Sequence, residues 1–239
     1  MEAIITQARI NSSRLPNKIF LEAAGRPFLY YHINRLKKAN LPIIVATTNN
    51  GSEKPIIEFC KENNLLYYCG DEKNVLQRFY QCAVKHHVDK IIRVTSDCPL
   101  IDADIIEKGI ATYRALNNNC VYYSNALKRT YPRGMDYEIF SFQLLEQAFL
   151  NAEEFSDKEH ATPYIWKNRS GKVLIEHDLN TNNDEDLRIT LDTEEDKILI
   201  TKLIEEFNAS ELNCKEIIKI LRNNIQLVDI NKAIEQKKV

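Results

Sequence analysis

Three cationic side chains lie close together near the start of the chain, in the stretch QARINSSRLPNK. They are Arg9, Arg14 and Lys18, and two hydroxyl side chains, Ser12 and Ser13, lie between them. Arg and Lys neutralise anions, and the backbone N–H groups of a tight loop can surround one. The stretch is therefore interpreted either as a solvated basic loop or as a polyphosphate-binding loop. The phosphate-binding patterns G-x-x-x-x-G-K-[ST] and G-x-G-x-x-G do not occur.

Two aspartates follow apolar runs that are typical of buried strands. Asp97 ends the run DKIIRVTSD, and Asp192 ends the run LRITLD. Because Mg²⁺ takes one or two carboxylates together with phosphate oxygens, these aspartates suit a metal site beside the basic loop. Asp97 alone would equally suit a turn. The acids that follow Asp192, at residues 194–196, are expected to do no more than cap a helix.

The elements that must position these side chains follow from the periodicity of the sequence. Short β-branched and aromatic runs alternate with segments of helical period, which indicates β-α-β units around a mainly parallel sheet. In the first half, strands are expected at 3–8, 42–48, 65–70 and 89–97, and helices at 28–39, from Ser52, at 74–87 and from Asp102 to Tyr113. Parallel strands end at one edge of the sheet, where open α/β folds bind ligands. The basic loop and Asp97 are therefore predicted to share that edge.

From about residue 119 the pattern changes. Strands are expected at 120–125, 135–141, 172–178 and 187–192, and helices near 141–152, 157–167, 193–207, 214–222 and 229–236. The stretch ALKRTYPRG, which joins the first two of these strands, is too long for a tight hairpin. No Gly/Ser linker or repeat interrupts the chain, so we expect a single domain over residues 1–239, with the second half elaborating the same sheet.

The composition limits the class of protein. The chain has 239 residues, 44% of them hydrophobic and 28% charged, and a net charge of −2, values that are ordinary for a soluble globular protein. This balance predicts no broad basic face and no nucleic-acid partner. No segment approaches the ~20 apolar residues of a membrane span, so we expect no membrane partner and a cytoplasmic location. The six cysteines lack metal-binding spacing and are expected to be reduced, mostly buried thiols.

Three motifs, A-R-x-x-S-x-R-L-P-x-K, T-x-D-C-P-L-I-D and L-D-T-x-E-D, resemble the signature stretches of nucleotidyltransferases that make CMP-activated acidic sugars. GDEKNVLQRF, YPRGMDYEIFS and EHATPYI resemble, in the same order, the SpsF-like branch (spore coat polysaccharide biosynthesis protein F), which is related to the CMP-acylneuraminate and CMP-Kdo synthetases. The resemblance implies a three-layer α/β/α fold with a mainly parallel, mixed central sheet, of the nucleotide-diphospho-sugar transferase-like (Rossmann-like) type.

The resemblance also implies an activity: a Mg²⁺-dependent cytidylyltransferase that transfers CMP from its co-substrate CTP to an acidic, nonulosonic or Kdo-like sugar, releasing pyrophosphate, for surface polysaccharide biosynthesis. It assigns residues 1–118 to nucleotide binding, 119–192 to the acceptor sugar and a homodimer contact, and 193–239 to C-terminal helices. The acceptor itself and the oligomeric state stay open.

The same resemblance gives roles to individual residues. The triphosphate would be held by Arg9, Ser12, Ser13, Arg14 and Lys18. Mg²⁺ would be held by Asp97 and Asp192. The base would lie over Thr47, Thr48, Asn74 and Arg78, and the acceptor would meet Arg133, Asp136 and Glu138. His160 is interpreted as a surface or hydrogen-bonded histidine rather than a base, and the role of Cys98 is left open.

Departures from the family pattern leave two other hypotheses. Asn11, Asn17 and Ser96 stand where relatives often carry Gly; Asn tolerates positive φ, so the loop is expected to form. One alternative is a nucleotide-binding relative that has lost turnover. The other is a nucleotide-sugar-dependent glycosyltransferase of related fold, whose Asp-x-Asp metal motif would be DAD at 102–104, a stretch better interpreted as the start of a helix.

Overall fold

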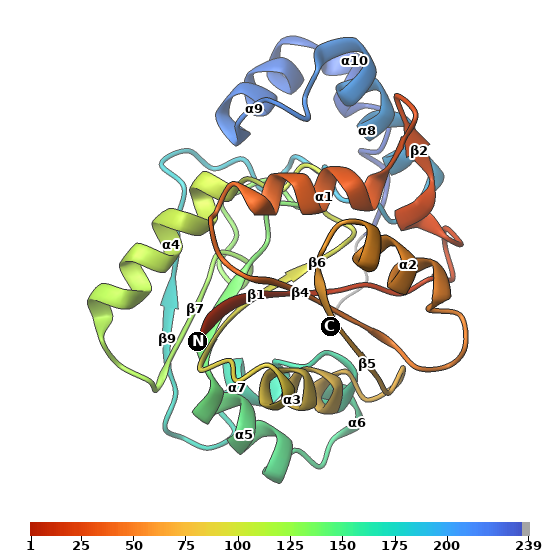
Figure 1. The fold of residues 1–239 in the computed structure, drawn as a ribbon. Helices are drawn as coiled ribbons and strands as arrows, with labels where there is room; N and C mark the ends of the chain where they lie inside the picture. Colours follow the sequence, from red (N-terminus) through yellow and green to blue (C-terminus); the bar gives the residue numbers. More distant parts are fainter. Residues whose placement is uncertain (236–239) are drawn as a thin grey trace.

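A seven-stranded mixed sheet forms the centre of the computed structural model, which describes residues 1–235 (Figure 1). The strand order is β5-β4-β1-β6-β8-β7-β9. β8 pairs antiparallel with β6 and β7, and the other neighbouring strands are parallel. This confirms the predicted mainly parallel, mixed sheet. The strands are β1 (Glu2–Gln7), β4 (Ile43–Thr48), β5 (Leu66–Gly70), β6 (Lys90–Thr95), β7 (Val121–Ser124), β8 (Glu138–Ser141) and β9 (Leu174–His177).

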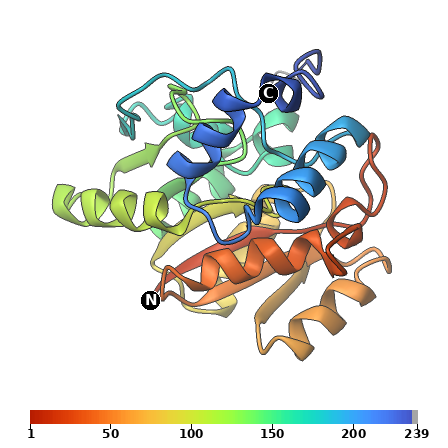
Figure 2. The same ribbon diagram turned by 90° about the horizontal axis from the view of Figure 1, so that it is seen from above.

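Helices cover both faces of the sheet, as the fold prediction requires (Figures 1 and 2). On one face lie α1 (Phe28–Lys37), α2 (Lys54–Glu62) and α4 (Ala103–Leu116), with the C-terminal α8 (Glu194–Phe207), α9 (Cys214–Asn223) and α10 (Ile225–Val228) stacked beyond them. On the other face lie α3 (Val75–Lys85), α5 (Phe142–Asn151), α6 (Phe155–Glu159) and α7 (Pro163–Trp166). A short helix, η1 (Lys18–Phe20), and a two-stranded ribbon, β2 (Glu22–Ala23) with β3 (Arg26–Pro27), precede α1. Within residues 1–235, no helix has the length and apolarity needed to span a bilayer.

The two faces of the sheet have separate cores because successive strand residues point to opposite sides. Ile4 and Ile92 belong to the cluster under α1, whereas their neighbours Ile5 and Ile91 belong to the cluster under α3. All four side chains are fully buried. The central strands are therefore held on both sides, and their carboxyl ends form a fixed edge.

The segment 187–192 is not a sheet strand, and that prediction was wrong. Its backbone is extended, but it pairs with loops: Arg133 N–H donates to the Leu187 carbonyl over 2.9 Å, and Ile189 N–H donates to the Arg133 carbonyl over 2.8 Å. Leu191 N–H then donates to the Asp97 carbonyl over 2.7 Å. The apolar alternation reflects burial between the sheet and the C-terminal helices, and the result is that the segment runs directly to Asp97.

Two predicted helices also differ in the structure. The helix expected at 157–167 is divided into α6 and α7, because Ala161 adopts a left-handed backbone conformation with φ of 67° just before Pro163. The helix expected at 229–236 is absent over residues 229–235: residues 229–233 form turns after α10, and residues 234–235 are irregular. Residue 236 lies outside the described residues.

Candidate active site

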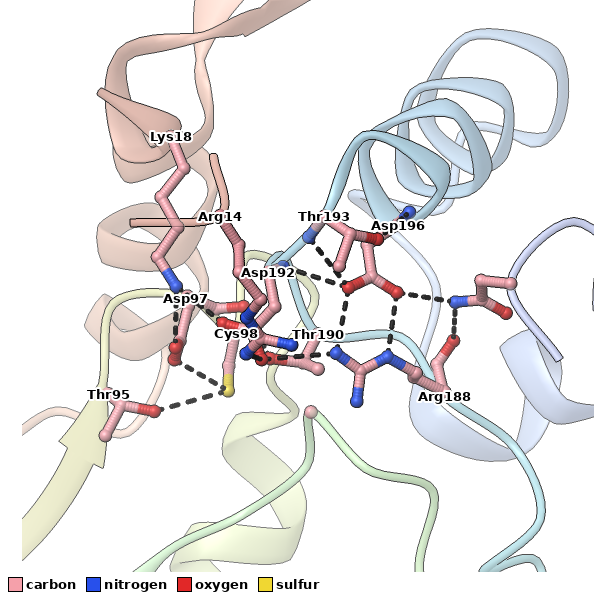
Figure 3. Close-up of polar contacts among 12 residues, drawn as sticks. Arg14, Lys18, Thr95, Asp97, Cys98, Arg188, Thr190, Asp192, Thr193 and Asp196 are labelled. Atoms are coloured by element: carbon pink, nitrogen blue, oxygen red, sulfur yellow. Dashed lines mark hydrogen bonds and ion pairs between the residues drawn. The ribbon is translucent and has the colours of Figure 1, made fainter. Parts of the chain in front are cut away.

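The ammonium group of Lys18 lies between two carboxylates at the carboxyl edge of the sheet (Figure 3). Its Nζ donates to Asp97 Oδ2 over 3.0 Å and to Asp192 Oδ1 over 2.8 Å. Arg14 completes the group, with its Nη2 3.1 Å from the second oxygen of Asp192, Oδ2. The basic loop and both predicted metal ligands thus meet in one cluster.

The register of β1 and β6 brings the loop and Asp97 together. Gln7 and Thr95 are paired at the ends of these parallel strands, and Ser96 N–H donates to the Gln7 carbonyl over 3.1 Å. The loop after β1 and the turn after β6 therefore leave the sheet side by side. The segment before Asp192 is tied to the same turn, because Thr190 Oγ1 donates to the Asp97 carbonyl over 3.1 Å.

A buried histidine fixes the turn that carries Asp97. His32 Nδ1 lies 2.9 Å from the Cys98 carbonyl, and its Nε2 lies 2.8 Å from Thr6 Oγ1. Burial lowers the pKa of His32 to about 4, so the ring is neutral at pH 7. Since a carbonyl can only accept, Nδ1 must donate to it, and Nε2 must accept from the Thr6 hydroxyl. Helix α1 therefore anchors the turn to strand β1.

A second buried network holds Asp192. Arg188 donates from Nη2 to Asp192 Oδ2 over 3.2 Å, and donates from Nε and Nη2 to the two oxygens of Asp196 over 2.8 and 2.9 Å. Asp196 is fully buried and also accepts from Asn231 Nδ2 over 2.8 Å. It accepts from the backbone N–H groups of Asp192 and Thr193 as well. Asp192 is therefore restrained on its backbone and on its side chain.

Asp196 had been expected only to cap its helix. It does so, in a capping box with Thr193, but the additional pair with Arg188 makes it part of the site's support. The sequence contains no local signal for this pair, because nothing in the segment shows that an Arg in an extended stretch folds back onto the next helix.

The cluster is electrostatically coupled. Burial alone would raise the pKa of the Asp97 carboxyl, but Lys18 and the hydrogen bonds from Thr95 and Lys18 outweigh it, and the pKa lies well below its usual range. Burial would likewise lower the pKa of Lys18, but Asp97 and Asp192 raise it overall. Lys18 and Asp97 are therefore both charged at pH 7. Burial raises the pKa of the adjacent Cys98 thiol, so it stays protonated.

The two carboxylates fit a divalent cation. Both already converge on one positive charge, the Lys18 ammonium, with O–N distances of 2.8 and 3.0 Å. In residues 1–235 no group of three or more His, Cys, Asp or Glu side chains gathers in a way that could hold a metal ion. A cation between Asp97 and Asp192 would thus need oxygens from water or substrate, which is the usual arrangement for Mg²⁺ with a phosphate ligand.

A cavity of about 490 Å³ opens beside this cluster. Of the predicted site residues, it is lined by Arg9, Ser12, Ser13, Arg14, Lys18, Arg78, Asp97 and Asp192. It is also lined by Gln7, Ala8, Glu72, Lys73, Val75, Thr95, Ser96, Phe155, Glu159 and His160. Four arginines and lysines of the basic loop and of α3 are thus placed around one space that is large enough for a nucleotide.

Arg78 is a fixed cation in the wall of the cavity. It is buried, and its Nη1 donates to the Asp71 carbonyl over 2.6 Å, while its Nε has no hydrogen-bond partner among residues 1–235. Burial and the nearby Arg9 and Arg93 lower its pKa to about 10, so it remains charged at pH 7. An unpaired buried donor beside a cavity favours a polar ligand there.

The other predicted base-binding residues do not line the cavity. The hydroxyl of Thr47 is buried at the end of β4 without a hydrogen-bond partner among residues 1–235, and Thr48 Oγ1 donates to Asn50 Oδ1 over 3.3 Å. Asn74 caps α3 by accepting from Gln77 N–H over 2.9 Å.

The predicted acceptor residues also lie outside it. Glu138 pairs with Arg93 over 2.5 Å, and Asp136 pairs with Arg129. Arg133 lies near Asp136 and Asp192, which favour its charged form, but burial lowers its pKa overall. Asp136 and Glu138 therefore both face arginines and not an open ligand space.

The loop residues that replace glycine differ in their backbone. Asn17 has a φ of 55°, a left-handed conformation that Asn tolerates, as expected. Asn11 is not in this conformation, so no glycine is required there, and its Nδ2 donates to Glu72 over 3.4 Å. Ser96 is buried and lines the cavity.

Comparisons with known proteins agree with this geometry. A family model described as Cytidylyltransferase matches residues 3–234. An uncharacterised protein of Methanocaldococcus jannaschii is 36% identical over 98% of this chain and 95% of its own length. The spore coat polysaccharide biosynthesis protein SpsF of Bacillus subtilis is 26% identical over 92% of this chain and 93% of its own. The 3-deoxy-manno-octulosonate cytidylyltransferase of Bartonella henselae is 33% identical over 48% of each chain.

A solved structure supports the same assignment. The structure of a cytidylyltransferase from Leptospira borgpetersenii matches with a TM-score of 0.88 and 29% identity, over 99% of this chain and 98% of its own. The predicted nucleotide-diphospho-sugar transferase-like fold and the SpsF-like resemblance are both confirmed.

Replacing Asp196 tests the network behind Asp192. Asp196→Asn leaves the buried Arg188 without its full counter-charge, and we expect a loss of about 3 kcal/mol in the free energy of unfolding, measured by urea denaturation. Glu194→Gln is the matched control: Glu194 is an exposed acid in the same helical turn, whose ion pair within residues 1–235 is with Lys197, and the change should cost less than about 0.5 kcal/mol. Equal losses would show that Asp196 only caps the helix.

Replacing Lys18 should change how the free energy of unfolding depends on pH. In the native chain the lowered pKa of Asp97 contributes stability above the unfolded value of about 3.9, and this stability is lost as the pH falls through the lower folded value. In Lys18→Met this stabilisation is absent and the two carboxylates repel, so we expect a loss of about 2 kcal/mol at pH 7.5 and a smaller, but not abolished, loss at pH 4, where protonation of Asp97 in the variant relieves part of the repulsion.

The control for this experiment is Lys73→Met, because Lys73 lines the same cavity but is exposed and makes no ion pair among residues 1–235. Its effect should be small at both values of pH in urea denaturation. A loss in Lys18→Met that is the same at pH 4 and pH 7.5 would contradict the electrostatic coupling.

Proposed function

The chain belongs to the cytidylyltransferase family, and we propose that it transfers CMP from CTP to a hydroxyl group of an acidic sugar, with Mg²⁺ as the metal. The observation that carries the proposal is the convergence of Lys18, Asp97 and Asp192 beside the basic cavity. The acidic sugar is supported by the 3-deoxy-manno-octulosonate cytidylyltransferase among the relatives. A role in surface polysaccharide synthesis is supported by the name of the SpsF relative.

The reaction suits a site without a covalent nucleophile. A sugar hydroxyl attacks the α-phosphorus of CTP in line; a new O–P bond forms while the bond from the α-phosphorus to the bridging oxygen breaks, and pyrophosphate leaves. Negative charge grows on the leaving group. Arg9, Arg14 and Lys18 line the cavity as cations that can stabilise this charge.

Asp97 and Asp192 would hold the metal, which when bound neutralises phosphate charge and polarises the P–O bonds. Arg188 and Asp196 keep Asp192 in place for this task. Lys18 would then exchange the carboxylates for a phosphate oxygen, so the same ammonium serves the site before and after CTP binds. Lys18 and Arg14 now pair with the carboxylate of Asp192. They are also cations of the kind that a triphosphate requires.

Arg78 is the best-placed group for the base. Cytosine presents the acceptors O2 and N3, and a guanidinium fork can donate to both. Arg78 is held rigidly by Asp71 and still has an unpaired N–H donor in the cavity wall. Uracil presents N3–H in place of the N3 acceptor, so this contact would favour CTP over UTP.

In the alternative hypothesis, a glycosyltransferase, the Asp-x-Asp stretch at 102–104 would have to bind a metal, but its first aspartate is used to cap a helix. Asp102 N-caps α4, accepting from Asp104 N–H over 3.0 Å, and its other oxygen accepts from Cys214 N–H over 2.6 Å. Asp102 and Asp104 do not line the 490 Å³ cavity. The DAD stretch is a helix start, as predicted.

Pyrophosphate release tests the proposal. The protein is incubated with Mg²⁺, each of the four ribonucleoside triphosphates and a panel of sugar acids that includes Kdo and N-acetylneuraminate. We expect release with CTP and one class of acid, reduced at least about 100-fold in Asp97→Asn and in Asp192→Asn.

The control is Asp89→Asn, since Asp89 is an exposed carboxylate that pairs with the amino terminus at the opposite edge of the sheet. It should keep full activity. Transfer from a nucleotide sugar, with no pyrophosphate from any triphosphate, would contradict the proposal.

A further inference from the structure

One wall of the cavity comes from a segment that no part of the proposed function uses. Phe155, Glu159 and His160, from α6 and its carboxyl end, line the same space as the basic loop. The Phe155 side chain is 68% exposed and forms part of the lining. The segment thus adds an aromatic ring, an acid and an imidazole to a cavity otherwise dominated by cations.

The backbone around His160 is held in a costly conformation. Ala161, the next residue, is fully buried with a φ of 67°, a region that residues other than Gly and Asn rarely occupy. Thr162 N–H donates to the His160 carbonyl over 2.9 Å, closing the turn. Strain of this kind persists where the surrounding structure imposes it, and it is frequent at functional sites.

Ion pairs connect α6 to the residues that follow α7. Asp157, almost fully buried in α6, lies 3.5 Å from Arg169 Nε and 4.0 Å from Lys167 Nζ. Arg169 also pairs with Glu154, at the amino end of α6. These ion pairs restrain the segment, while Phe155 and His160 line the cavity.

The imidazole of His160 is the one histidine side chain among the cavity's lining residues, and it has no hydrogen-bond partner among residues 1–235. It is half-buried, and its Nε2 lies 3.8 Å from Glu159 Oε2. Burial lowers its pKa below 6.5; Glu159 opposes this, while Arg93 on β6, Lys167 after α7 and Arg9 in the basic loop lower it further. The ring is therefore mainly neutral at pH 7, with one nitrogen able to accept a proton.

Apart from Glu159, whose Oε2 lies 3.8 Å from His160 Nε2, the other bases that line the cavity have partners. Asp97 and Asp192 are paired with Lys18. Glu72 accepts from Asn50 over 2.6 Å and from Asn11 over 3.4 Å. A carboxylate held by a cation or by amide donors is a weak proton acceptor, because those donors stabilise its charged form. His160 is thus the lining group whose protonation state best suits proton transfer near neutral pH.

We propose that His160 is the proton acceptor for the hydroxyl that attacks CTP, and that the wall of Phe155, Glu159 and His160 is the acceptor side of the cavity. This rests on the proposed function. As the oxygen–phosphorus bond forms, the hydroxyl proton passes to a nitrogen of His160, and the bond to pyrophosphate breaks. Glu159, 3.8 Å away, stabilises the imidazolium that results.

The test compares His160→Asn with His87→Asn, since His87 is an exposed histidine at the opposite edge of the sheet, where its carbonyl accepts from the amino terminus over 2.6 Å. Pyrophosphate release from CTP is measured from pH 5 to 9 with water, Kdo or N-acetylneuraminate as the attacking hydroxyl. CTP binding is measured by calorimetry.

We expect His160→Asn to lower kcat about 100-fold and to remove the acid limb of the pH profile, with CTP affinity changed less than about two-fold. The wild-type limb should have its midpoint below 6.5, matching the titration of the His160 ring by NMR. His87→Asn should match the wild type throughout.

Four outcomes would overturn the inference. A pH profile that keeps its acid limb in His160→Asn, or a ring that titrates above pH 7, would exclude the role of base while leaving the proposed function intact. Loss of CTP affinity equal to the loss of kcat would place His160 on the nucleotide instead. Absence of pyrophosphate from CTP in the wild type with every acceptor would contradict the proposed function and the inference with it.

Discussion

The ion pair of Lys18 with Asp97 and Asp192 is the contact on which the rest of the site depends. Each partner comes from a different part of the chain: the loop after β1, the turn after β6, and the segment before α8. Two carboxylates this close repel unless a cation lies between them. The fold therefore provides a cation of its own. Under the proposed function, a metal ion between the two carboxylates would meet the same requirement and would leave Lys18 and Arg14 for the triphosphate.

Much of the structure around this contact serves to keep Asp97 and Asp192 in place. The neutral His32 holds the Asp97 turn through its carbonyl neighbour, and the buried Arg188–Asp196 pair holds Asp192 from the side of the C-terminal helices. Burying such a pair costs desolvation energy that an apolar pair would not, so it is better explained by the positioning of Asp192 than by stability. Asn231 extends this support to the turns after α10.

The sequence was sufficient for the sheet, the basic loop and both aspartates, because strand periodicity places carboxyl ends at one edge and charge marks the loop. It was insufficient where one pattern fits two structures. The alternation of apolar and polar residues at 187–192 is typical of a sheet strand, yet the segment pairs with the Arg133 loop. Asp196 looked like a helix cap alone because its partner Arg188 is brought back to it only by folding.

The most direct test of the account is a calorimetric titration of the protein with CTP, with and without Mg²⁺, beside UTP, ATP and GTP. We predict CTP binding that strengthens at least about ten-fold with Mg²⁺, since a cation held between Asp97 and Asp192 would replace Lys18 there and free it for the phosphates. Binding of the other three nucleotides should be weaker, because Arg78 is placed to donate to the O2 and N3 acceptors of cytosine. Equal affinity for all four nucleotides, or CTP binding that Mg²⁺ does not change, would contradict the account.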